Sequence, residues 1–184
     1  MLYPPITNFG LKGMQKWADL VLKWPKQFKD QNLFACLLNV FIYIEIGGTG
    51  GSFFRNMYAD FLEESADVLK IPKLKEVAKV FRGSAKIWSE IAKTALPDSW
   101  PVLKDMRELM AKKNSIFEAQ KPNALDEMKK ISRALENEIK QAIEEIQNRK
   151  NDTELLLNNL SKKILECLEI ERQAFEQLNK AINP

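Results

Sequence analysis

Apolar residues recur at the spacing of an α-helix along almost the whole chain. Over residues 11–24 they fall at i, i+3, i+4 and i+7, which places them on one face of a helix. Pro25 ends this helix and can begin the next one, because its missing N–H costs nothing in a first turn. The next helix is expected to run to about Ile46. Since it is apolar nearly all round from Leu33, we expect it to be the most buried element.

Two more amphipathic helices are predicted over residues 52–71 and 73–96. Ser52 is a plausible N-cap of the first helix, and Pro72 stops it. The inner face of the first helix is expected to carry Phe54, Met57, Phe61 and Val68. The second helix carries one apolar stripe formed by Leu74, Val77, Ala78, Phe81, Ala85, Trp88, Ala92 and Ala95.

The remaining part of the pattern predicts a helix over residues 102–120 and then a long helical hairpin, with arms over residues 125–149 and 153–182. We find no alternating pattern typical of β-strands. The fold class is therefore all-α, a multi-helix bundle of about six or seven helices with the hairpin at its C-terminal end. The chain is expected to form a single helical domain over residues 1–184. Residues 1–121 would form a core around a glycine-rich loop, and residues 122–184 the hairpin packed on it.

Composition is that of an ordinary globular protein, with 45% hydrophobic and 29% charged residues among 184. The formal net charge of +3 is too small to indicate nucleic-acid binding. The chain has no histidine, which removes His-based metal sites and the commonest general base. Cys36 and Cys167 lie among apolar residues, so we expect buried free thiols rather than a disulfide or a nucleophile. We expect no metal and no cofactor.

The sequence shows neither a signal peptide nor a stretch long and apolar enough to span a membrane. The N-terminus has neither a basic region nor an apolar region of a signal peptide. The most apolar stretch, residues 33–46, is shorter than the roughly 20 residues that a membrane span requires. We therefore expect a cytoplasmic protein that binds neither membrane nor nucleic acid and that could form a homo-oligomer.

A glycine-rich stretch over residues 46–58 holds four of the seven glycines. Dense glycines allow positive φ or close backbone approach, and a helix that begins after them can bind anions. A phosphate-binding P-loop requires Lys and Ser or Thr after its last glycine, which this stretch lacks. Arg55 could hold a carboxylate or phosphate at the helix start. A tight packing corner and a ligand- or partner-contacting loop both remain open, the second using Gly48, Thr49, Gly50, Gly51, Ser52, Arg55 and Tyr58.

A basic stripe is predicted on the helix over residues 73–96. Its cations lie within about a 60° sector of the helix: Lys75, Lys79, Arg82, Lys86 and Lys93. Such a stripe suits docking to an acidic protein surface, and an ordinary solvated helix face is the alternative. Aromatic residues do not alternate with these charges, which disfavours single-stranded nucleic acid as the partner.

Several segments resemble the C-terminal helical domain of the butirosin biosynthesis protein H family. The most specific is residues 48–64, which contains the glycine stretch, Arg55 and Tyr58. Further likenesses are Pro4-Pro5 with Gly10-Leu11-Lys12-Gly13, Trp24, Ala85 with Trp88, and Ile170-Glu171 with Ala174-Phe175 and Leu178. Full-length members of that family join an N-terminal papain-like domain to this helical one.

The resemblance implies that this chain corresponds to the accessory half of such a protein, and not to its catalytic half. The family is similar to acyltransferases that take an acyl group from an acyl carrier protein, and its catalytic cysteine and histidine belong to the papain-like domain. This chain has no histidine, and neither cysteine lies in a family motif. We therefore expect a non-catalytic helical domain that contacts a papain-like catalytic domain or an acyl carrier protein. The alternative is a helical protein that binds a small anionic ligand with its glycine-rich loop and Arg55.

Overall fold

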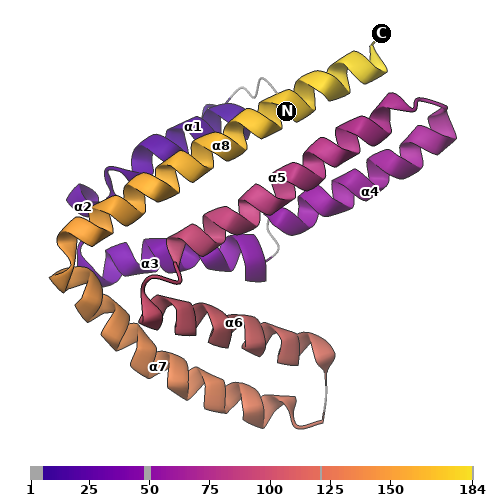
Figure 1. Cartoon of the computed structure of the whole chain (residues 1–184). Helices are drawn as coiled ribbons and strands as arrows, with labels where there is room; N and C mark the ends of the chain where they lie inside the picture. Colours follow the sequence, from indigo (N-terminus) through magenta and orange to yellow (C-terminus); the bar gives the residue numbers. More distant parts are fainter. Residues whose placement is uncertain (1–5, 48–50, 121, 184) are drawn as a thin grey trace.

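The computed structural model describes residues 6–47, 51–120 and 122–183, and these residues form eight α-helices and one π-helical turn without a β-strand (Figure 1). The first half contains α1 (Gly10–Val21), α2 (Trp24–Gln27), α3 (Asp30–Phe41), the π-helical turn η1 (Ile42–Ile46) and α4 (Ser52–Leu69). The second half contains α5 (Lys73–Ala95), α6 (Pro101–Ala119), α7 (Ala124–Asn148) and α8 (Lys150–Ile182). The prediction of an all-α bundle is confirmed.

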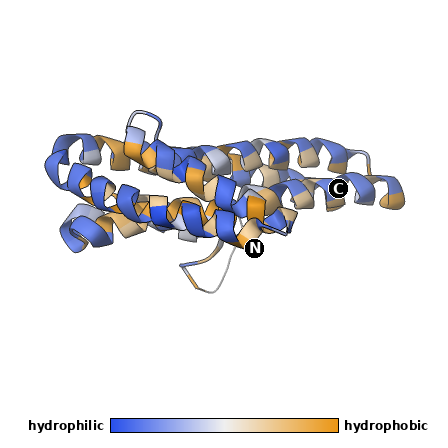
Figure 2. Cartoon of the chain, turned by 90° about the horizontal axis from the view of Figure 1, so that it is seen from below, coloured by the Kyte–Doolittle hydropathy of each residue, from blue (hydrophilic) through white to orange (hydrophobic). Residues whose placement is uncertain are grey.

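Helix α5 lies at the centre of the arrangement. It packs between α4 and α8, and α1 lies along the other side of α8 (Figure 1). Its apolar stripe is buried as predicted, with only Trp88 partly exposed. Hydrophilic residues lie along the helices beside hydrophobic ones, as expected of amphipathic helices (Figure 2). Within the described ranges, no helix combines the length and the hydropathy that crossing a membrane requires.

Two hydrophobic clusters form the core. The larger one joins α1, α3, α5, α6, α7 and α8, with Leu37, Ile91, Met106 and Leu160 fully buried at its centre. The smaller one joins only α4, α5 and the C-terminal part of α8, around Leu62, Val77 and Phe81. Both clusters include residues beyond position 121, so the last helices contribute to the core itself.

The predicted single helix over residues 25–46 is wrong, because the chain turns at Phe28 and Lys29. Both residues have extended backbone conformations, and Asp30 then has a positive φ of 48°. This reorients the chain between the short α2 and α3. The segment is also less buried than predicted, since Tyr43 in η1 is 58% exposed.

The two C-terminal helices are both present, but they diverge from the turn at Arg149 (Figure 1). Helix α7 packs against α6, whereas α8 packs against α1 and α5. The buried residues of α7 are Ile131, Ala142 and Ile146. Helix α6 supplies most of the contact with α7, where the other arm of a hairpin was expected. At the turn, Arg149 pairs with Asp152 at 2.8 Å and its guanidinium lies over the ring of Trp100.

The predicted inner face of α4 is wrong, and this is the largest difference from the sequence expectation. Phe54, Met57, Phe61 and Val68 are 44%, 48%, 58% and 72% exposed. The buried residues of α4 are instead Ala59, Leu62 and Ala66, which lie in one cluster with the apolar stripe of α5. Because two of these side chains are small, α4 can pack closely on α5. The large apolar side chains are then left on the outer face.

Candidate functional site: a buried ion pair that joins three helices

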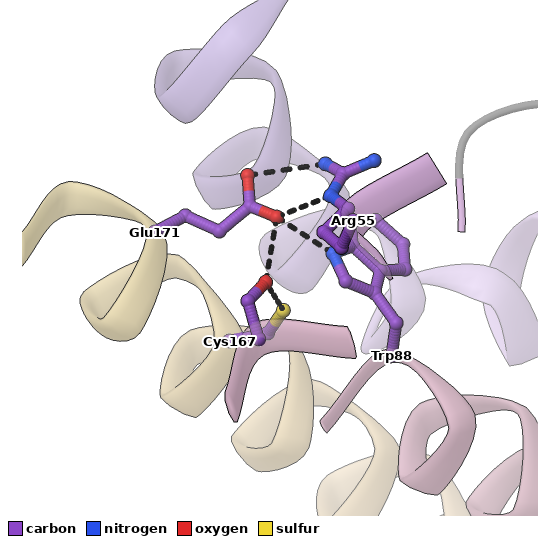
Figure 3. A network of polar contacts seen from close by, with 5 residues as sticks. Arg55, Trp88, Cys167 and Glu171 are labelled. Carbon is purple, nitrogen blue, oxygen red and sulfur yellow. Dashed lines mark hydrogen bonds and ion pairs between the residues drawn. The ribbon is translucent and has the colours of Figure 1, made fainter. Parts of the chain in front are cut away.

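Glu171 of α8 is a buried carboxylate that accepts hydrogen bonds from three side chains (Figure 3). Arg55 donates from Nε at 2.6 Å and from Nη2 at 3.1 Å, one bond to each carboxylate oxygen. Ser84 Oγ donates at 2.9 Å and Trp88 Nε1 at 2.7 Å. Glu171 is only 3% exposed. A charge buried this deeply requires a partner of opposite charge and satisfied lone pairs, and these donors provide both.

Helical spacing explains how the sequence builds this site. Ser84 and Trp88 are four residues apart on α5, and Cys167 and Glu171 are four residues apart on α8, so each pair shares one helix face. Arg55 projects from the first turn of α4, and its guanidinium lies 4.7 Å from the centre of the Trp88 ring. Trp17 of α1 stacks on Trp88 with ring centroids 6.0 Å apart. The ion pair therefore ties together α4, α5 and α8, and α1 joins through stacking.

The pairing of Arg55 with Glu171 weakens the interpretation that Arg55 binds an anionic ligand. The sequence indicated that Arg55 could hold a carboxylate by two hydrogen bonds, and the structure supplies that carboxylate from the chain itself. An external anion would have to displace Glu171 or share Arg55 with it. Sequence reasoning did not identify Glu171 as this partner, although a glutamate on the buried face of α8 was a visible signal.

Cys167 lies beside the ion pair, and its thiol is unreactive. Burial, together with the nearby charge of Glu171, raises the pKa of its thiol to about 12, and its Sγ lies 4.0 Å from Ser84 Oγ. The thiolate is the reactive form, so a pKa this high leaves Cys167 unreactive near neutral pH. Both cysteines are free thiols, as predicted, but Cys36 is only partly buried. Cys36 lines a pocket of about 400 Å³ together with Trp17, Trp24 and Trp88.

We expect iodoacetamide to label one thiol of the folded protein at mildly alkaline pH. Cys36 should react because part of it is exposed, although burial raises its pKa as well. Cys167 should react only after unfolding, because it is fully buried and its pKa is about 12. Peptide mass spectrometry of native and urea-unfolded samples measures this. Equal labelling of both cysteines in the folded protein would contradict the buried position of Cys167.

The glycine-rich loop contributes a close backbone contact. A Cβ added to Gly51 would lie 2.6 Å from the carbonyl oxygen of Ile44 and 2.8 Å from its Cα. The φ of Gly51 is −79°, so close approach, and not a positive φ, requires glycine here. Gly51 thus fits the packing-corner interpretation, while Gly48, Thr49 and Gly50 lie outside the described residues.

Ser52 is not the N-cap that the sequence suggested. It is the first residue of α4, Gly51 holds the cap position, and no side chain makes a capping bond there. The Ser52 hydroxyl instead donates to Glu45 Oε1 at 3.5 Å. Glycine is among the residues favoured at an N-cap, so Gly51 can hold this position without a side-chain capping bond.

Tyr58 belongs to an aromatic cluster. Its ring meets Phe81 of α5 edge to face at 4.8 Å, and Phe81 meets Phe175 of α8 in the same way at 5.5 Å. Burial raises the pKa of Tyr58. These rings form part of a groove of about 590 Å³, which we call the aromatic groove. It is lined by Phe54, Arg55, Met57, Tyr58, Phe61, Phe81, Glu171 and Phe175.

Most cations of the predicted basic stripe are paired with carboxylates. Lys75 pairs with Asp67 at 2.6 Å, Arg82 with Asp60 at 2.7 Å and with Glu63 at 2.9 Å. These three acids belong to α4, so the stripe faces the acidic side of the neighbouring helix. Lys79 pairs with Glu76 and Lys93 with Asp98, each within α5 or the turn after it, and Lys86 is exposed. Because these pairs are exposed and neutralise one another, the stripe favours an ordinary solvated face.

The fold and the ion pair define an all-α bundle in which a buried arginine–glutamate contact ties three helices together. The chain belongs to the family described as "Domain of unknown function (DUF4872)", which matches residues 1–111. The match contains Arg55, Ser84 and Trp88, whereas Glu171 and Cys167 lie beyond it. Comparison with curated proteins and with solved structures found no match.

Proposed function

We propose that the chain is a non-catalytic helical accessory domain that binds another protein through the exposed face of α4. The observation that carries the proposal is the exposure of Phe53, Phe54, Met57 and Phe61 on one helix. Large contiguous apolar patches on a protein surface mark interaction sites, whereas single exposed apolar residues are ordinary. Four such side chains within three turns of one helix form a patch of this kind.

The resemblance to the butirosin biosynthesis protein H family supplies two candidate partners, a papain-like catalytic domain and an acyl carrier protein. The charge of α4 favours the first. Three of its four carboxylates pair with cations of α5, and its one arginine pairs with Glu171. Among the described residues, Glu64 is thus left as an unmatched negative charge on the exposed face. An acidic carrier protein would be repelled by this surface. A cytoplasmic location remains our expectation for such a system.

Anionic-ligand binding at the glycine-rich loop has less support. Arg55 is the cation that this alternative requires, and its two hydrogen bonds to Glu171 occupy it. The interaction role has the stronger basis because the large apolar side chains of α4 are exposed to solvent.

The proposal is tested with the papain-like domain of a butirosin biosynthesis protein H family member, and with an acyl carrier protein in parallel. Calorimetric titration should show that the papain-like protein binds the wild type. Phe54→Ser combined with Met57→Ser should weaken that binding by about tenfold or more, the loss typical of a central interface residue. Phe117→Ser is the matched control, because Phe117 is 64% exposed on α6 and does not line the groove.

Two results would overturn the proposal. One is that neither protein binds the wild type at high micromolar concentration. The other is that the double variant and Phe117→Ser bind as well as the wild type, which would leave the α4 face without a role. Thermal melts of each variant confirm that it is folded before binding is compared.

A further inference from the structure

The aromatic groove lies between packed helices, at a place where one more helix could pack. Helices α4 and α8 run in the same direction on either side of α5 (Figure 1). Phe81 of α5 forms the floor, and Tyr58 and Phe175 pack against it from the two walls. The smaller hydrophobic cluster beneath is built by these three helices alone. A fourth helix laid in the groove would cover it.

The outer face of α4 has the spacing of a helix that packs against another helix. Phe54, Met57, Phe61, Glu64 and Val68 fall at i, i+3, i+7, i+10 and i+14, a seven-residue repeat of the kind that forms coiled-coil seams. On α8, Leu178 and Ile182 follow the groove residue Phe175 at i+3 and i+7, so the three share one helix face. The α4 seam extends about 21 Å at 1.5 Å per residue. This length matches a partner segment of about four helical turns.

Resting on the proposed function, we infer that the aromatic groove binds one amphipathic helix of the partner protein. The bound helix carries apolar residues at i, i+3 or i+4, and i+7, the pattern of anchors that enter a hydrophobic groove. Its flanking residues are lysine or arginine. Phe54, Met57 and Phe61 supply the apolar contact on the α4 wall, and Glu64 supplies the charge.

Glu64 specifies the basic flank. It lies on the exposed seam between Phe61 and Val68, and no ion pair of the described residues includes it. The other acids of α4 already share the cations of α5, and Arg55 is matched by Glu171. A lysine or arginine on the partner helix would therefore meet an unmatched carboxylate at the edge of an apolar contact, where complementary charge sets register and partner choice.

A second copy of this chain fits the groove poorly. A second α4 helix laid on this face would offer Glu64 no cation, because the only basic residue of α4 is Arg55 and that side chain pairs with Glu171. An uncompensated charge at a helix contact selects against that pairing. A basic partner helix is therefore the better occupant.

The test uses two fluorescein-labelled synthetic peptides of about 18 residues, or five helical turns. Both carry leucine at the same i, i+3, i+4 and i+7 positions, and the remaining positions are lysine and glutamine in one and glutamate and glutamine in the other. By fluorescence anisotropy at low salt, the lysine peptide should bind the full chain at least about tenfold more tightly. The net charge of +3 favours the glutamate peptide, so a preference for lysine reports the local charge of the groove.

Three variants locate the binding. Phe61→Ser should weaken the lysine peptide by about tenfold or more, and Phe117→Ser, the exposed control on α6, should leave it unchanged. Glu64→Lys should remove or reverse the preference between the two peptides. Far-ultraviolet circular dichroism melts establish that each variant is folded.

Three outcomes would overturn the inference. They are equal binding of both peptides by the wild type, equal effects of Phe61→Ser and Phe117→Ser, or a wild-type dimer in sedimentation that Phe61→Ser dissociates. The last would make a second copy the occupant. If the papain-like protein binds through α4 while the lysine peptide does not, the helix inference fails and the proposed function stands. If the lysine peptide, the papain-like protein and the acyl carrier protein all fail to bind the wild type, both the inference and the proposed function fail.

Discussion

Glu171→Ala is expected to lower the free energy of unfolding by about 3–5 kcal/mol, the loss typical of a broken buried ion pair. The substitution leaves the Arg55 charge in a partly buried site and removes the acceptor of Ser84 and Trp88. It also removes the hydrogen bonds that join α8 to Arg55 of α4. Urea unfolding followed by circular dichroism measures the change.

The matched control is Glu169→Ala, two residues earlier on the same helix. Glu169 pairs with Arg172 at 2.9 Å, but both side chains are about half exposed. Exposed pairs contribute about 0–1 kcal/mol, so this variant should unfold close to the wild type. A double-mutant cycle with Arg55→Ala should show strong coupling to Glu171. Equal destabilisation by the two glutamate substitutions would mean that the buried pair does not hold the helices together.

Gly51→Val is expected to destabilise the protein by about 1–3 kcal/mol, as overpacking of a close contact does. The new Cβ would lie within 2.6–2.8 Å of three atoms of Ile44, and two of these belong to the backbone, which cannot move aside cheaply. Ile44 of η1 or the first residues of α4 would have to shift. Thermal and urea unfolding measure the effect, and the same prediction stands for Gly50→Val, although Gly50 lies outside the described residues.

Gly83→Ala provides the control of opposite sign. Gly83 lies inside α5, and a Cβ added there would meet only the Cδ1 atom of Ile170 at 3.5 Å, an ordinary contact. Alanine should therefore stabilise the helix by about 0.5–1 kcal/mol through its lower conformational entropy in the unfolded chain. If Gly51→Val melted like the wild type, the close approach at Ile44 would not be a constraint on the fold.

Helical periodicity was sufficient to predict α5 because that helix has one continuous apolar stripe that the core covers. It was not sufficient for α4, which carries two seams. One consists of Phe54, Met57, Phe61 and Val68, and the other of Ala59, Leu62 and Ala66. Hydrophobicity favours the first as the inner face, but small side chains allow closer packing, and the structure buries the second. Helical periodicity shows that a helix has an apolar face, but it does not show whether the core covers that face.

The candidate site could be predicted only in part. Arg55 stood out in the sequence because it opens a helix after a glycine-rich loop. Its partner did not, because Glu171 is 116 residues away and meets it only after α8 has packed on α5. The divergence of α7 from α8 was hidden for a similar reason. Both helices have apolar faces suited to a hairpin, and their separation depends on where α6 and α1 lie.

The Arg55–Glu171 contact joins the region that matches the family to a helix beyond it, so both belong to one folding unit. The region that defines the family ends at residue 111, yet the carboxylate that neutralises Arg55 and accepts from Ser84 and Trp88 comes from α8. Cut at that boundary, α5 would lose the neighbour that covers one side of it, and a charged side chain would lose its counter-ion. The residues that match the family model are thus fewer than the residues needed to complete the hydrophobic core and the ion pair. During synthesis, α4 and α5 leave the ribosome long before the segment that completes them.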